Sequence, residues 1–267
     1  MYGGVTSFIK EDYLTNFYPI DTYNFKQQPG IIGYAVAAST EPVVELHKYK
    51  SINITVKKKT LEKCIDGNCL ASGLFENARE PIYKYAPAEL GSVHAWTFLN
   101  LAKSLSEDET ATVILNRVGD VRRGVFGDDF TATATVIGQQ SPAVDLVPGV
   151  YAVTGLLTSE KPLVIPEEER CTDDIILGFG ETCFTLDETV LDKLLEGQLQ
   201  WDTPPTYFTI TPEQLYGSQE IVIPILGIEF YEVPPQSGLR VIEDLQAMGQ
   251  LGNLSEHLRP QLQPRFQ

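Results

Sequence analysis

The sequence predicts a mainly β protein built from antiparallel, sandwich-like sheets with few helices. Ile52, Ile54 and Val56 alternate with polar residues, and residues 130–136 repeat the pattern, with the period of two that a half-buried strand requires. Turn-forming stretches such as Val147-Pro148-Gly149 separate most of the other β-rich segments. Many short strands divided by glycine and proline are typical of antiparallel sandwiches.

Residues 1–30 form an aromatic segment without a sustained helical or strand period. Their large side chains include Phe8, Tyr13, Phe17 and Tyr18. Leaving so many apolar rings in water is unfavourable. We therefore expect this segment to wrap around the protein's own core, and contact with a partner is the alternative.

Two β-rich regions follow. Residues 31–140 are expected to form a β-rich domain with one helix, and residues 146–235 a β-sandwich domain, with Gln139–Pro142 as the boundary. The strands expected in these regions, besides the two above, are Thr112–Val118, Val150–Thr158, Leu163–Ile165, Tyr207–Ile210, Glu220–Leu226 and Ile228–Val233.

Three short helices are expected within these regions. Apolar residues recur at helical spacing between Pro87 and Leu105. Asp187–Glu196 has an aspartate that can cap the first turn and is followed by Gly197, a common helix stop. Thr211-Pro212-Glu213-Gln214 has the pattern of a capping box with proline at the first helical position.

The C-terminal region, residues 236–267, predicts an amphipathic helix followed by an extended tail. The tail is expected at Arg259–Pro264, where the two prolines oppose a helix. The helix can pack on the body of the protein or dock onto another chain. Its apolar face makes five residues the candidates for contacting a partner: Leu239, Ile242, Leu245, Met248 and Leu251.

Charge and hydropathy exclude two classes of partner. The net charge of −16 repels phosphate backbones, so we expect no nucleic acid. The longest apolar runs are far shorter than the ~20 residues of a membrane-spanning helix, so no transmembrane segment is expected. Residues 1–10 lack the features of a signal peptide. Either the protein is cytoplasmic or the sequence begins after an export signal. We expect the second, which leaves membrane anchoring upstream open.

The four cysteines predict two local disulfides, Cys64–Cys69 and Cys171–Cys183. Their spacing fits neither a structural zinc site nor a Cys-x-x-Cys redox motif. Facing residues of an antiparallel hairpin, in contrast, lie close enough for a disulfide. Disulfides persist in oxidising compartments. We therefore expect an extracytoplasmic location: periplasmic, on the cell surface or secreted.

No catalytic motif is present, and we predict no catalytic residue, metal site or cofactor. Of the three histidines, His94 beside Trp96 and His257 near a helix end suit structural roles better than catalysis. Asp120, Asp128 and Asp129 are oxygen ligands in one stretch, but their spacing matches no calcium-loop pattern.

The function predicted from these observations is a non-catalytic, exported structural, adhesive or assembly protein of the cell envelope or surface, which binds a protein partner or self-assembles. One alternative is a carbohydrate-binding module or glycan-active enzyme that uses Trp96, Trp201 and Tyr207 as a stacking platform. A virion surface protein is the other alternative, because it would share the sandwich fold.

Overall fold

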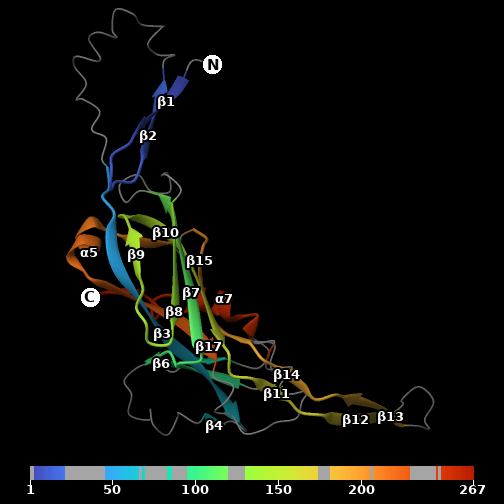
Figure 1. Ribbon diagram of the computed structural model, residues 1–267. Coiled ribbons are helices and arrows are strands. Elements are labelled where there is room, and N and C mark those ends of the chain that lie inside the picture. Colours follow the sequence, from blue (N-terminus) through green and yellow to red (C-terminus); the bar gives the residue numbers. More distant parts are fainter. Residues whose placement is uncertain are drawn as a thin grey trace, which may run out of the picture.

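The computed structural model describes residues 3–21, 46–65, 68–69, 83–85, 95–119, 130–173, 181–204, 207–228, 245 and 248–267. Within them the protein is mainly β, as predicted. Most strands join one 12-stranded, mostly antiparallel sheet that curls around an apolar core (Figure 1). A sandwich of two stacked sheets is not confirmed by this arrangement.

The neighbouring strands of this sheet follow the order β5-β6-β3-β17-β15-β10-β7-β8, while β4 and β9 also pair with β3, β16 with β10 and β18 with β17. Among the described strands of the sheet, only β3 and β17 pair in parallel. The strands are β3 (Lys50–Ile65), β4 (Asn68–Cys69), β5 (Tyr83–Tyr85), β6 (Ala95–Ser104), β7 (Glu109–Gly119), β8 (Phe130–Ile137), β9 (Ala143–Leu146), β10 (Gly149–Ser159), β15 (Leu194–Trp201), β16 (Phe208–Ile210), β17 (Glu220–Ile228) and β18 (Arg265–Phe266).

The period of two places the apolar side chains inside the curl. In β3, Ile52, Ile54 and Val56 are buried, and in β8 the buried positions alternate with exposed threonines. Both strands therefore confirm the alternation seen in the sequence. Each strand covers the core with one face and meets solvent with the other.

The expected boundary at Gln139–Pro142 lies inside the sheet. This stretch connects β8 to β9, and strands on either side of it are hydrogen-bonded neighbours, since β7 pairs with β10 and β3 with β17. Residues 31–140 and 146–235 thus share one sheet in the part of the chain that the structure describes. Turn residues mark a chain reversal as readily as a linker, so they could not separate the two cases.

Two of the three expected helices are wrong. Asp187–Glu196 contains β14 (Thr189–Leu191) and the start of β15 instead of a helix. The second half of Pro87–Leu105 is strand β6, and its first part lies outside the described residues. Pairing of β6 with β3 and of β15 with β10 overrides the helical spacing of the leucines, because packing outweighs weak local propensity.

The third helix, α5 (Pro212–Gly217), is confirmed with its capping box. The Gln214 N–H donates to Thr211 Oγ1 at 3.3 Å, and the Thr211 N–H donates to Gln214 Oε1 at 3.0 Å. Leu215 is buried and anchors the turn to the core. Two residues connect the helix to β17.

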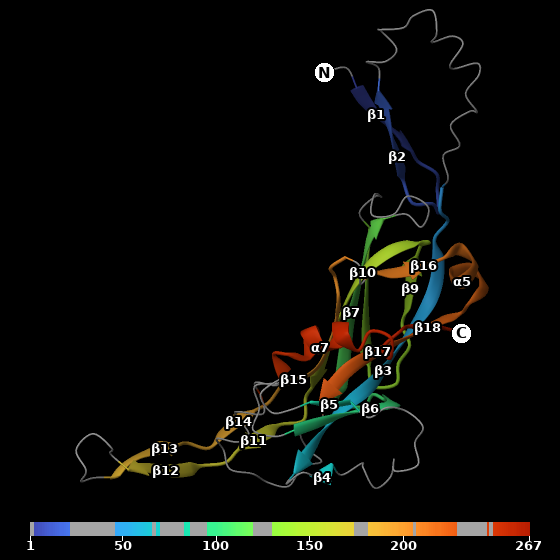
Figure 2. The same cartoon turned by 180° about the vertical axis from the view of Figure 1, so that it is seen from behind.

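The C-terminal helix packs on the body of the protein. Its described part, α7 (Leu251–His257), lies against β15 and β17 (Figure 2). Leu251, Leu254 and Leu258 are buried in the common core. A Cβ at Gly252 would lie 2.6 Å from Gln200 Oε1, so the side chain of Gln200 would have to shift to admit one.

The prediction of an extended tail is wrong at its beginning. The Leu262 N–H donates to the Leu258 carbonyl at 3.1 Å, which continues the helical turn, and Leu262 is fully buried. Pro260 is tolerated because it stands near the start of this short turn, where its missing N–H breaks no bond. The chain then becomes extended at Arg265–Phe266, which pairs with β17.

Two-stranded ribbons project from opposite ends of the sheet (Figures 1 and 2). At one end β1 (Gly3–Phe8) pairs with β2 (Asn16–Asp21). This hairpin extends away from the body, so the expectation that residues 1–30 wrap around the core is wrong for residues 3–21. Its base is held by the Tyr49 N–H, which donates to the Asp12 carbonyl at 2.9 Å.

At the other end lies a longer ribbon, here called the distal ribbon. It consists of β11 (Leu163–Ile165) paired with β14, followed outward by β12 (Glu168–Asp173) paired with β13 (Glu181–Leu186). In the described part of the chain no helix has the length and apolar character needed to cross a membrane.

Candidate functional site

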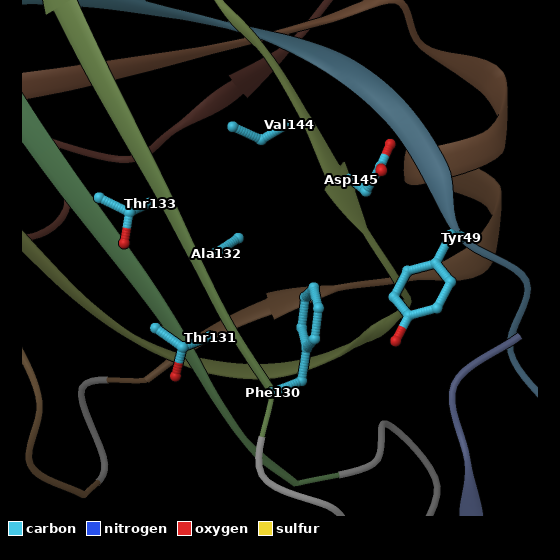
Figure 3. A pocket seen from close by; sticks show the side chains of 7 residues that line it. All are labelled: Tyr49, Phe130, Thr131, Ala132, Thr133, Val144 and Asp145. Atoms are coloured by element: carbon cyan, nitrogen blue, oxygen red, sulfur yellow. The ribbon is translucent and has the colours of Figure 1, made fainter. Parts of the chain in front are cut away.

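A surface pocket of about 410 Å³ opens between β8, β9 and the start of β3 (Figure 3). β8 pairs with β7 and β9 pairs with β3, but no backbone pairing joins β8 to β9 in the described part of the sheet. The pocket is the open seam between these two edges. Its lining residues are Tyr49, Phe130, Thr131, Ala132, Thr133, Val144 and Asp145.

The seam combines apolar surface with one negative charge. The ring centroids of Tyr49 and Phe130 lie 5.5 Å apart at one end of the pocket. Phe130 and Val144 are half-buried and pack against the core, so the seam exposes part of the protein's interior. Asp145 is the one charged residue in the lining. This surface can bind an apolar group together with a cation, but it brings together no acid–base pair for catalysis.

A second pocket, of about 380 Å³, lies near the turn between β6 and β7. A hydrogen bond with Ser106 is the main cause that lowers the pKa of Asp108 at its rim. Lys103 and Lys161 also line the pocket. Its deepest charged side chains belong to three strands of the sheet: Lys58 of β3, Glu109 of β7 and Glu196 of β15.

These three side chains form a buried charged cluster. The Lys58 ammonium donates to Glu109 Oε1 and lies 3.5 Å from Glu196 Oε2. The Ser106 N–H donates to Glu109 Oε2 at 2.7 Å. Lys58 is 6 %, Glu109 4 % and Glu196 2 % exposed, so almost none of their surface is open to a substrate.

The cluster has one more carboxyl group than it has cations. Burial raises the pKa of Glu196 to about 7, a rise that Lys58 opposes and neighbouring Glu109 reinforces. Glu196 Oε1 accepts no hydrogen bond within the described part of the chain. The arrangement can hold a proton near neutral pH. Both carboxyl groups contact the one lysine, so the cluster joins β3, β7 and β15.

The structure confirms the disulfide Cys171–Cys183. The two residues face each other in the β12–β13 register and are bonded. Glu169 lies close to the two sulfur atoms, but sulfurs engaged in a disulfide are not thiolate ligands for a metal. Cys64 and Cys69 also face each other, in the β3–β4 register. Their disulfide stays a prediction, because their side chains lie outside what the structure describes.

Trp201 does not belong to an exposed aromatic platform. Trp201 is fully buried, and its ring contacts Phe208 and Arg259 inside the protein. Tyr207 is half-buried, and the side chain of Trp96 lies outside what the structure describes. Trp201 is therefore a core residue and cannot stack on a sugar.

The structure describes only some of the residues predicted as candidates for partner contact, metal binding or a histidine role. Met248 and Leu251 are buried against the body, and Leu245 is half-buried. His257 is exposed at the end of α7, as its structural interpretation allows. The candidates that lie outside the described residues are Leu239, Ile242, His94, Asp120, Asp128 and Asp129.

Sequence reasoning missed the charged cluster. Lys58 continues the inward-facing series that begins at Ile52, so the period of two could have identified it as a buried charge. The predicted helix Asp187–Glu196 includes Glu196, so the period of two was not applied to this residue. A comparison with known protein families, curated proteins and solved structures found no match to this chain.

Proposed function

We propose that the protein is a non-catalytic, extracytoplasmic structural or assembly component that binds partner proteins through its distal ribbon. The observation that carries this proposal is apolar surface on an element that projects from the body. Val164 and Val190 face each other across β11 and β14 and are 48 % and 49 % exposed. Phe184 on β13 is 50 % exposed.

These side chains do not contribute to the core. On β11 the neighbours Leu163 and Ile165 are buried, so the ribbon already has an inward face, and Val164 lies on the opposite one. Exposed apolar side chains grouped on one element are typical of surfaces that bind other proteins. The distal ribbon thus offers a partner a preformed apolar surface.

The disulfide supports both the location and the role. Cys171–Cys183 joins the two strands next to the exposed Phe184. A disulfide indicates an oxidising compartment, and a cross-linked ribbon loses less conformational entropy when it binds.

The test is site-specific photo-crosslinking in the cells that produce the protein. A benzophenone amino acid replaces Phe184, and in a control it replaces Tyr216, an aromatic residue of similar exposure on α5. We expect a discrete adduct with another envelope protein from position 184 only. The adduct should disappear when V164T and V190T are added. Equal labelling from both positions, or a protein found in the cytoplasm, contradicts the proposal.

A further inference from the structure

Among the described strands, none pairs with the backbone groups that face the seam between β8 and β9. The Gly138 N–H donates to the Glu109 carbonyl at 2.9 Å, which sets the alternation of the β7–β8 ladder. Since facing residues alternate between bonded and non-bonded pairs, the N–H and C=O groups of Thr131, Thr133 and Thr135 are directed away from β7. They form the seam edge of β8.

The edge of β9 shows the same alternation. The Ile54 N–H donates to the Pro142 carbonyl at 2.9 Å, next to the β3–β9 pairs. The backbone groups of Ala143 and Asp145 are therefore directed away from β3. Two strand edges that no described strand covers thus border one pocket of about 410 Å³.

We propose that this seam binds an extended peptide segment of a partner protein by strand addition, with a basic side chain of the peptide against Asp145. The interaction goes beyond the function proposed above, because the seam and the distal ribbon are different surfaces. Main-chain hydrogen bonds supply affinity in such complexes, and alternate side chains supply specificity.

The lining defines the chemistry of the peptide. Side chains directed inward meet Phe130, Ala132 and Val144, so they are apolar, and the small Ala132 leaves room for them. Side chains directed outward lie beside the exposed Thr131 and Thr133, so they are polar. The net charge of −16 opposes a second copy of the chain and favours a basic partner segment.

The experiment uses the full chain as bait for a random heptapeptide library displayed on phage. We expect the enriched peptides to alternate apolar and polar residues and to carry a lysine or arginine. The affinity of a synthetic enriched peptide is then measured by calorimetry. D145N should weaken its binding and reduce the dependence on salt.

A pair of substitutions at one position separates the backbone from the side chain. T133P removes an N–H that faces the seam, not β7, and should lower the affinity about tenfold or more. T133A keeps the N–H and should leave the affinity within about twofold. Equal effects of the two variants, or a selection without enrichment, would overturn the proposal.

Hydrogen exchange provides a measurement that does not depend on the folding of T133P. The amides of Thr131 and Thr133 should exchange more slowly when the synthetic peptide is added, whereas those of Ala132 and Ala134 are already bonded to β7. Unchanged exchange at both threonines contradicts strand addition. The other possible occupant of the seam is a second copy of the chain, which sedimentation of the protein alone would detect as a dimer. A dimer that is lost in T133P would show that a second copy binds there and would reject the partner peptide.

Discussion

Lys58 is a charged side chain at a position where the strand pattern calls for an apolar one. Its ammonium contacts carboxyl groups from β7 and β15, strands that are distant in sequence. Buried ion pairs are weak sources of stability, but removing one member leaves an uncompensated charge. The cluster therefore makes the sheet depend on a single cation.

Replacing Lys58 with methionine should destabilise the protein by about 3–5 kcal/mol at pH 7.5, because Glu109 and Glu196 then share a buried site without a cation. Lys57→Met is the matched control. Lys57 donates to Ser104 Oγ at 2.8 Å on an exposed surface, so its loss should cost less than about 1 kcal/mol. Urea unfolding measures both. Similar midpoints for the two variants would refute the dependence on Lys58.

Glu196 links the stability of the fold to pH. Its pKa is raised to about 7 in the folded state, mainly by burial, and is about 4.3 in an unfolded chain. At pH values between these two pKa values, the folded state binds the proton of Glu196 more tightly than the unfolded state does. The resulting stabilisation is complete below the unfolded pKa and is lost as the pH rises through about 7.

Glu196→Gln should therefore gain stability relative to the wild type as the pH rises. We expect the difference in unfolding free energy to shift by about 1–3 kcal/mol in favour of the variant between pH 5.5 and 8.5. Glu188→Gln, at an exposed position, is the control and should show no comparable shift. A parallel pH dependence of both variants would show that Glu196 does not titrate in this range.

We expect the stability of the distal ribbon to be separable from that of the body. Its outer strands β12 and β13 pair with each other and join no strand of the large sheet. A cross-link spanning 12 residues is worth about 2–3 kcal/mol in the loop-entropy account. Here that stabilisation acts locally.

Replacing Cys171 and Cys183 with serine should speed hydrogen exchange in β12 and β13 by about tenfold or more, because their pairing then opens more easily. The melting temperature of the sheet should change by less than about 2 °C, since the core is untouched. Calorimetry and exchange mass spectrometry measure the two effects. A large fall in melting temperature would mean that the ribbon and the sheet unfold together.

At the scale of the whole molecule, the sequence predicted which face of a strand is buried, but it did not predict which strands pair with each other. The alternation at Ile52–Val56 predicted which side chains enter the core, because period is a local property. It could not predict that β3 pairs with β17, since register depends on residues far along the chain. Leu191, Leu194 and Leu195 illustrate the limit, because their helical spacing was overridden by strand pairing.

The same limit applies to the candidate sites. Cysteine spacing predicted the Cys171–Cys183 bond because both residues belong to one hairpin. The charged cluster joins strands separated by dozens of residues, so no local pattern marks it. The seam lies between β8 and β9, which only residues 138–142 separate, but its lining also includes Tyr49 from a distant part of the chain. Only the curl of the sheet brings their side chains together.

The parallel pairing of β3 with β17 has a consequence for how the chain is made. Residues 53–61 pair with residues 220–228, so that side of β3 stays uncovered until residues 220–228 have been synthesised. A chain emerging from its N-terminus therefore keeps a hydrophobic strand edge open until most of its length has followed. Such late closure slows folding. It also leaves a long interval in which the chain can still be threaded through a channel or held by a chaperone.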